Sequence, residues 1–286
     1  MIRPLPRIAL ASMALLLVSP PSFARSVRPE ENRAELQAEF DRALAEFDDG
    51  QQSRRIDRDQ AIVLYRSAAR RFENMIQRGV VNGKLEFNTG NAYLQAADVG
   101  RAILHYRRAE RLIPRDPLLA DNLSDARKRC LTNIPPSRRS VALQNVFFWH
   151  HQTSLRGRWR AALVFYVGCW TLLAIESFVP RRSVTITTCV LGGLSLMLFS
   201  SVAVQRWQEH HAPQGVVTSM DVVVYKGPGT GYQRLFEQPL QPGVEFTLRE
   251  RRAGWWNIEL PDGRPGWIDE TTAALVTSEQ LLGLSF

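Results

Sequence analysis

Apolar residues in this chain gather in three long runs, separated by stretches in which apolar and polar positions are mixed. The first run covers residues 8–18, and the two later runs cover residues 161–179 and 184–204, which are 19 and 21 residues long. At a rise of ~1.5 Å per residue, each later run approaches the ~30 Å thickness of the hydrocarbon core of a bilayer. These two runs predict transmembrane helices.

The first apolar run has the features of a secretory signal peptide. Arg3 and Arg7 precede an apolar core of eleven residues, and Ser22 and Ala24 are small residues at the two positions that a signal peptidase recognises. An uncleaved anchor is the alternative, although the core is shorter than the ~20 residues that span a bilayer. Residues 1–24 therefore predict that the following chain is exported.

The two predicted spans must form a tight hairpin, because only residues 180–183 separate them. Arg181 and Arg182 in this turn favour the cytoplasmic side of the membrane, which would place both flanks outside the cytosol. Three arginines before the first span, between residues 156 and 160, favour the opposite orientation. The signal peptide acts first during export, so we expect both flanks to face outward.

Residues 29–134 have a helical pattern without strand-like runs, and their most regular part is residues 83–116. In this part, small residues, aromatic residues and a proline fall at fixed positions of a 34-residue frame: Gly90, Tyr93, Ala102, Tyr106, Ala109 and Pro114. The pattern resembles a tetratricopeptide repeat, in which small residues lie where two helices cross and aromatic residues fill the space beside them. Glu86 and Thr89 depart from the family, which usually has large apolar residues there.

One such repeat cannot bury its own apolar face, so neighbouring repeats are expected. Ala61, Tyr65 and Ala68 repeat the spacing of three residues in the best repeat, displaced by 41 residues. This displacement predicts an upstream repeat that is about two helical turns longer, with its first helix at residues 31–47. Residues 117–130 predict a capping helix, so residues 29–134 would hold two repeats and a cap in an all-α solenoid.

The inner face of such an array is where relatives bind peptides. Asn91 and Asn122 match two positions of the carboxylate clamp of chaperone-binding relatives, but Phe87 stands where that clamp has a lysine. The alternative is that these asparagines are solvated or cap local turns. The expected groove residues are Lys84, Phe87, Asn88, Asn91, Leu94 and Asn122.

Residues 135–160 mix aromatic residues with arginines and histidines, a composition that is typical of the membrane interface. We expect them to form a linker along the outer leaflet, in contact with membrane lipid. His150 and His151, together with His210 and His211, raise the alternative of a metal site. Because neighbouring residues complete no ligand set, no metal is expected.

Residues 215–276 change to short runs in which apolar and polar residues alternate, separated by glycine and proline turns. The turns are Gly227-Pro228-Gly229, Pro242-Gly243, Gly254-Trp255-Trp256, Asp262-Gly263 and Gly266-Trp267-Ile268. Their order resembles bacterial SH3-like domains, which implies a small all-β barrel. Trp255, Trp256 and Trp267 are expected to supply core that so small a domain otherwise lacks. Relatives often bind peptides or cell-wall fragments, which leaves a binding role for the tryptophans as an alternative.

Composition excludes several classes of protein. With 45% hydrophobic and 22% charged residues, the 286-residue chain is neither disordered throughout nor a transporter with many spans. Two of its three cysteines lie in apolar runs, so it has no disulfide framework. The net charge of +8 comes from scattered arginines, and no nucleic-acid partner is expected.

The chain has no motif for hydrolysis or phosphate binding, which predicts a non-enzyme without a cofactor.

The order of signal peptide, repeats, membrane hairpin and SH3-like domain resembles the BatE proteins of the Bacteroides aerotolerance group. The part of the chain that carries most of this resemblance is residues 88–129, where the repeat continues into an Asn-Leu helix. The resemblance implies an inner-membrane protein with both folded parts in the periplasm. Its implied partners are Bat proteins with von Willebrand A domains and, indirectly, a MoxR-type ATPase that serves stress or oxygen tolerance.

Two functions remain open at this stage. The first is a non-enzymatic scaffold that holds protein partners near the bilayer through two outward-facing modules. The second is a cell-wall sensor that binds peptidoglycan through the SH3-like domain.

Overall fold

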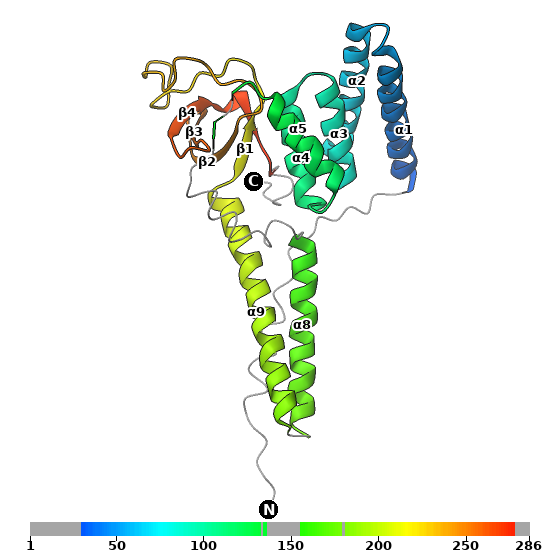
Figure 1. Cartoon of the computed structure of the whole chain (residues 1–286), viewed down its shortest axis with the longest axis vertical. Coiled ribbons are helices and arrows are strands. Elements are labelled where there is room, and N and C mark those ends of the chain that lie inside the picture. The colour runs from blue at the N-terminus through cyan, green and yellow to red at the C-terminus, as the bar shows by residue number, and fades with distance from the viewer. Residues whose placement is uncertain (1–29, 133, 136–154, 179–180, 278–286) are drawn as a thin grey trace, which may run out of the picture.

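The structure is a computed structural model that describes residues 30–132, 134–135, 155–178 and 181–277 (Figure 1). These residues form seven α-helices and one small antiparallel sheet. The predicted signal peptide, most of the predicted interfacial linker, and His150 and His151 lie outside the described residues.

Five helices at the N-terminal end pack as two antiparallel hairpins and a further helix. Each hairpin brings two helices together along their length, and the helix after Pro117 packs on the second hairpin. The five helices are α1 (Glu30–Ser53), α2 (Arg58–Gln77), α3 (Gly83–Gln95), α4 (Val99–Leu112) and α5 (Pro117–Arg129).

Four of these helices begin at a side chain that satisfies a free backbone N–H. Asp57 accepts from the backbone N–H of Gln60 at 2.9 Å, and Asn82 accepts from that of Lys84 at 2.8 Å. Asp98 and Asp116 do the same for α4 and α5. Such caps stabilise a helix by about 1 kcal/mol each, and they fix where the helix starts.

The second hairpin depends on a close contact between α3 and α4. A Cβ atom added at Gly90 would lie 2.6 Å from the ring of Tyr106, so only glycine permits this approach. Tyr106 is fully buried, and its hydroxyl donates to Asn91 at 2.8 Å. In the first hairpin, Gly50 approaches the ring of Tyr65 in the same way.

The first hairpin is longer than the second. Its helices α1 and α2 have 24 and 20 residues, whereas α3 and α4 have 13 and 14. The greater length of α2 accounts for most of the displacement of Ala61, Tyr65 and Ala68 from their counterparts in α4, which is 41 residues instead of the 34 of a regular repeat.

The C-terminal part forms a five-stranded antiparallel sheet with the strand order β4-β3-β2-β1-β5. The sheet is open, in contrast to the predicted closed barrel, because β4 and β5 are not paired with each other. A bridge between Val222 and Leu240 pairs two parts of the long β1–β2 connection, and a bridge between Tyr225 and Trp267 joins this connection to β4. The strands are β1 (Gln214–Val217), β2 (Glu245–Arg252), β3 (Trp255–Glu259), β4 (Pro265–Asp269) and β5 (Ala273–Leu275).

Two of the three tryptophans expected in the core of this part are buried, whereas Trp255 is only half-buried. Trp256 is 8% exposed and Trp267 is 9% exposed, and Trp256 packs near Phe246. Ile258, two residues after Trp256 on the same face of β3, is fully buried. The alternation read from the sequence therefore corresponds to one inward face of the strand.

The two apolar runs form a pair of long helices, which we call the stem. They are α8 (Leu155–Glu176) and α9 (Arg182–His211). Within them, residues 157–176 and 182–204 are long and apolar enough to cross a membrane. α8 begins before the predicted span, so residues 155–160, expected in the linker, belong to it, but it ends at Glu176, before the predicted end of the span at residue 179. α9 contains the whole of the second predicted span.

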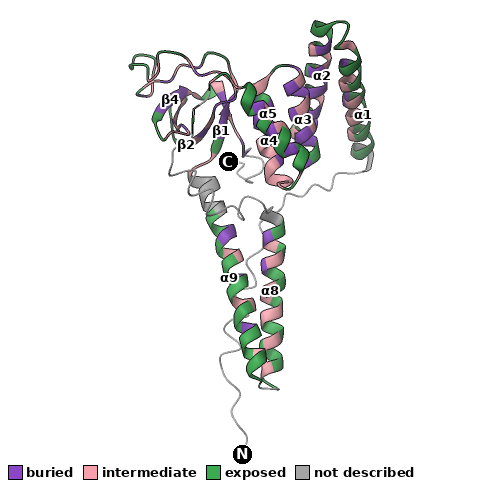
Figure 2. Ribbon diagram, viewed as in Figure 1, coloured by how far each residue is buried: buried purple, intermediate pink, exposed green. Residues whose placement is uncertain are grey.

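The stem presents apolar side chains outward. Leu163, Val164, Val190 and Met197 are more than 40% exposed, and Figure 2 shows how little of either helix is buried. A helix of a water-soluble protein turns such residues toward a core, so this surface fits contact with lipid chains. At the end of the stem away from the α8–α9 turn, Arg158 on α8 donates to Ser201 on α9 at 2.7 Å.

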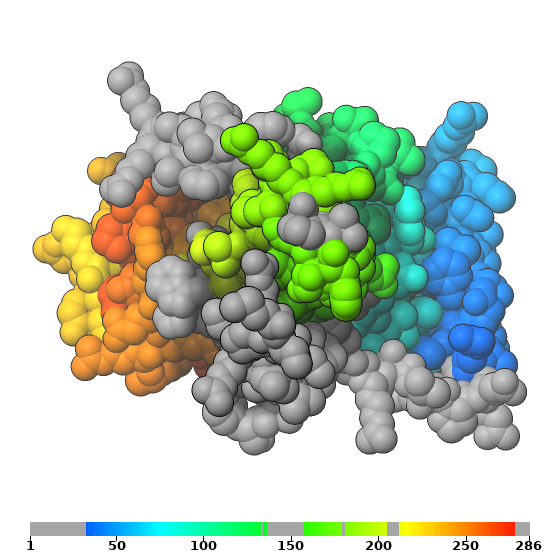
Figure 3. All heavy atoms as spheres, turned by 90° about the horizontal axis from the view of Figure 1, so that it is seen from below, coloured from blue at the N-terminus to red at the C-terminus, as the bar shows by residue number. Residues whose placement is uncertain are grey.

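The five N-terminal helices and the sheet lie at one end of the stem, and we call them together the head. The α8–α9 turn lies at the opposite end (Figure 1). Viewed along the stem, the helix pair lies beneath the junction between the sheet and the helices (Figure 3). Both folded parts therefore meet the stem on the same side.

The head is one body rather than two modules joined by a linker. A Cβ atom at Gly100 would lie 2.8 Å from the carbonyl oxygen of Val217 in β1, which shows how closely α4 approaches the sheet. Val216 and Val276 belong to the same hydrophobic core as the helices. The helical part and the sheet thus share part of their core.

Candidate interaction site

Ion pairs between α4, α5 and β2 connect the two parts of the head. Glu245 on β2 lies 3.0 Å from Arg107 and 2.6 Å from Arg127. Burial raises the pKa of Glu245, but the charges of both arginines and the hydrogen bond from Arg127 outweigh this effect, so its pKa is lowered. Glu245 is therefore held in its charged form between two helices.

Two more arginines of α4 reach the C-terminal strand. Arg108 donates to the carbonyl oxygen of Leu275 at 3.0 Å, and Arg111 donates to the hydroxyl of Thr277 at 2.6 Å. Arg107, Arg108 and Arg111 of α4 therefore have partners within the chain. A surface for other proteins must be sought on other faces of the head.

The structure brings the expected groove asparagines together. Asn122 donates to the amide oxygen of Asn91 at 2.8 Å, and the hydroxyl of Tyr106 donates to the same oxygen. These contacts hold α5 to the second hairpin. A carboxylate clamp would need both amides to turn toward a peptide, so clamp binding stays a prediction.

The other expected groove residues divide into buried and exposed ones. Phe87 and Leu94 are 8% and 7% exposed, and the ring of Phe87 lies 5.9 Å from that of Tyr106. Lys84 is exposed and forms an ion pair with Asp116 at the start of α5. Asn88 is half-buried. A peptide on this face would meet mainly polar side chains.

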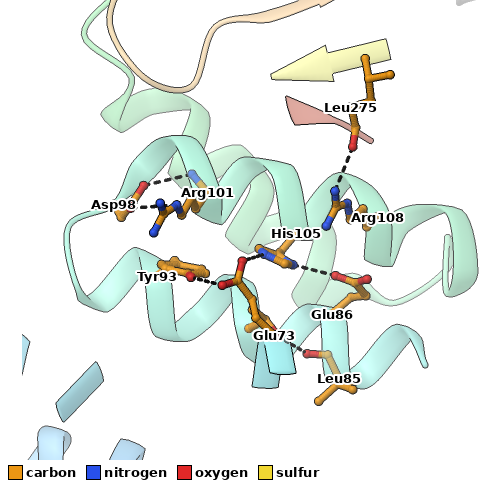
Figure 4. A network of polar contacts seen from close by, with 10 residues as sticks. Glu73, Leu85, Glu86, Tyr93, Asp98, Arg101, His105, Arg108 and Leu275 are labelled. Atoms are coloured by element: carbon orange, nitrogen blue, oxygen red, sulfur yellow. Dashed lines mark hydrogen bonds and ion pairs between the residues drawn. The ribbon is translucent and has the colours of Figure 1, made fainter. Parts of the chain in front are cut away.

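A buried histidine joins three helices and was not anticipated from the sequence (Figure 4). His105 on α4 is 1% exposed; its Nδ1 lies 2.7 Å from Glu86 on α3, and its Nε2 lies 3.1 Å from Glu73 on α2. The hydroxyl of Tyr93 donates to the second oxygen of Glu73 at 2.6 Å, and its ring stacks on the imidazole. The arrangement fits an imidazolium between two carboxylates.

In this network the pKa of His105 is raised and the pKa of Glu73 is lowered. Burial lowers the pKa of His105, but its hydrogen bonds to Glu73 and Glu86 outweigh that effect and raise it. Burial raises the pKa of Glu73, but the hydrogen bond and charge of His105 outweigh it, with help from Tyr93, and lower it. Both shifts favour the charged pair.

The network could have been anticipated from Glu86 and Thr89, the two departures from the tetratricopeptide pattern. Glu86 and Thr89 occupy positions that are usually apolar, and both are buried, at 5% and 0% exposed. Glu86 pairs with His105, and the hydroxyl of Thr89 donates to the carbonyl oxygen of Leu85 at 2.8 Å. Glu86 therefore makes a polar contact with α4, whereas the hydroxyl of Thr89 is satisfied within α3.

We expect the stability of the head to depend on pH through this network. Because the pKa of His105 is raised, its contribution is complete below about pH 6.5 and is lost as the pH rises through the folded-state pKa. Because the pKa of Glu73 is lowered, its contribution is present above about pH 4.5 and is lost as the pH falls. Denaturant unfolding between pH 4 and 9 should show greatest stability between these values.

His105→Gln provides the control for this prediction. Glutamine keeps a polar side chain but cannot carry the positive charge, so the loss of stability above pH 6.5 should disappear. At pH 6 the variant should be less stable by about 1–3 kcal/mol, because two carboxylates lose a charged partner. An unchanged pH profile in His105→Gln would contradict the assigned charge state.

The described residues contain no group of three or more His, Cys, Asp and Glu side chains arranged to hold a metal ion. His210 and His211 end α9, and their side chains are outside the described part of the chain. No protein-family model, curated protein or solved structure matches the chain.

Proposed function

We propose that the chain is a non-enzymatic scaffold that holds protein partners beside a membrane. The observation that carries this proposal is the shared head on one end of an apolar helix pair. Anchoring by the stem would raise the effective concentration of any partner that the head binds. A single body, connected by Glu245 and by the contact at Gly100, would present its surfaces in fixed relative positions.

The finer assignment follows the resemblance to BatE proteins. In this assignment the five helices are a short tetratricopeptide-repeat solenoid, and the sheet is an SH3-like domain. The stem lies in the bacterial inner membrane, and the head lies in the periplasm. The partners are Bat proteins with von Willebrand A domains, which connect the scaffold indirectly to a MoxR-type ATPase.

The burial of the tryptophans favours this function over a cell-wall sensor. Of the three tryptophans that a glycan would be expected to contact, Trp256 and Trp267 are buried, and Trp255 is half-buried with its ring edge-on to that of Tyr225. Most of the surface of these three rings is therefore not available to a peptidoglycan ligand. Protein binding through the combined head does not depend on access to these tryptophans.

Co-purification tests the proposed function. The full chain would be cross-linked in native membranes, extracted in a mild detergent and compared with a chain that carries only the stem, residues 155–211. Recovery of a von Willebrand A-domain protein with the full chain, and its loss with the stem alone, is the expected result. Recovery of no partner by either chain would contradict a scaffold.

A further inference from the structure

The head contains a small cavity at its far end from the stem. The cavity lies between the α1–α2 turn, the end of α3 and the start of α4, and has a volume of about 160 Å³. Ile62, Leu94 and Val99 line it with apolar atoms. An apolar cavity of about 150 Å³ holds a benzene-sized group, so this one has room for one side chain of a ligand.

The charged residues around this cavity all have the same sign. Arg54, Arg58 and Arg129 line it, and no carboxylate occurs among its lining residues in the described chain. Arg54 donates to Gln95 at 3.2 Å, and Arg129 pairs with Asp125 at 2.6 Å, whereas Arg58 has no ion pair with any described residue. The cavity is therefore complementary to an anion attached to an apolar group.

Tyr65 provides an independent indication of a ligand. Its side chain lines the cavity and is 1% exposed, yet its hydroxyl has no hydrogen-bond partner among the described residues. Its ring packs against Gly50 and Phe47, with the ring centroids of Phe47 and Tyr65 5.2 Å apart. A buried hydroxyl is costly to leave unpaired, so a carboxylate oxygen that accepts from it would be stabilising.

The position of the cavity favours a protein ligand over the bilayer that holds the stem. Figure 1 shows the α1–α2 turn, which carries Arg54, at the end of the head opposite the stem. Lipid headgroups of that bilayer would lie near the other end. An acidic segment of a partner protein can reach this site without crossing the head.

We propose that this cavity binds an acidic peptide segment of a partner protein. One apolar side chain enters the cavity, while a neighbouring carboxylate pairs with the arginines and accepts a hydrogen bond from the hydroxyl of Tyr65. The inference rests on the proposed scaffold function and adds the chemistry of the partner. It uses the end of the array, separate from the paired asparagines Asn91 and Asn122.

Peptide binding to the full chain in nanodiscs tests the proposal. The probe is a fluorescein-labelled hexapeptide of alternating alanine and glutamate that ends in leucine, and its comparison has glutamine for every glutamate. We expect saturable binding of the acidic peptide with a Kd below about 1 mM, and at least ~10-fold weaker binding of the glutamine peptide. Raising the salt concentration should weaken binding, because exposed charges are screened.

Substitutions that keep the fold locate the site. Arg58→Gln should weaken binding by ~10-fold, and Tyr65→Phe, which removes only the hydroxyl, by ~3-fold or more. Arg42→Gln, on an exposed position of α1 outside the cavity, is the matched control and should leave the Kd unchanged. Circular dichroism would establish that each variant keeps its helices.

Each contrary outcome has a distinct meaning. Equal affinity for the two peptides, equal affinity of Arg58→Gln and the unsubstituted chain, or no saturable binding at about 1 mM would overturn the proposal. If the chain bound phosphatidylglycerol vesicles but not the peptide, and Arg58→Gln abolished the binding of vesicles, the site would be a lipid site and the proposal would be overturned. Co-purification of partners with Arg58→Gln at the original yield would overturn this site while leaving the scaffold function intact.

Discussion

Tyr106→Ala should destabilise the helical part of the head by about 3–5 kcal/mol, the usual effect of removing a large buried aromatic side chain. Tyr106 is fully buried between α3 and α4, where its ring fills the space above Gly90. Its hydroxyl also holds Asn91, which in turn holds Asn122 on α5. The substitution therefore leaves a cavity and releases the last helix of the array.

Pulse proteolysis of the full chain in a mild detergent, at increasing urea, would measure this loss. Tyr106→Phe is the control, since it keeps the ring and removes only the hydroxyl, and it should cost about 1 kcal/mol. If the alanine variant were no less stable than the phenylalanine variant, the ring could not be the centre of the α3–α4 contact.

Gly100→Val should separate the helical part from the sheet. A Cβ atom at this position would lie 2.8 Å from the carbonyl oxygen of Val217 and 2.9 Å from the side chain of Pro242. The first of these is a backbone atom of β1, so the clash can be relieved only by moving α4 away from the sheet. Such overpacking costs about 1–3 kcal/mol.

Hydrogen exchange followed by mass spectrometry would detect the separation. Protection in β1 and β5 should fall in Gly100→Val, because both strands lie against the helices, whereas protection in β3 should change less. Ser124→Val on the exposed side of α5 is a control for the lower helix propensity of valine. Equal protection of β1 in both variants would show that the two parts of the head are independent.

The sequence was informative wherever a local rule applied. The long apolar runs predicted the stem helices, and the change to alternating apolar and polar residues predicted the sheet. The spacing of Ala61, Tyr65 and Ala68 predicted a longer upstream hairpin, and the helix lengths agree. These features depend on residues that are close together along the chain.

Contacts between distant segments could not be predicted in this way. Glu245 follows Arg127 by 118 residues, and nothing in either local pattern indicates that they pair. His105 is one polar residue in an amphipathic helix, and its burial depends on Glu73 from another hairpin. The open sheet and the shared core likewise depend on how α4 packs against β1.

The same reasoning applies to the candidate sites. Asn91 and Asn122 were identified from the resemblance to a tetratricopeptide repeat, and the structure adds that they bond to each other. The cavity beside Tyr65 combines residues from four helices and the turns between them, so no single stretch of sequence indicates it. In the sequence, the arginines of this cavity cannot be distinguished from ordinary solvated charges.

The central claim is that the whole head lies on one side of the membrane. Its most direct test uses single cysteines placed at Ser124, Glu270 and Ser177, in a chain whose Cys130, Cys169 and Cys189 are replaced by serine. Ser124 and Glu270 are exposed on the two parts of the head, and Ser177 is exposed near the α8–α9 turn.

A maleimide that cannot cross membranes should label the two head positions in intact spheroplasts, and should label position 177 only after lysis. Protection of position 124 or position 270 before lysis, followed by labelling of that position after lysis, would contradict the account.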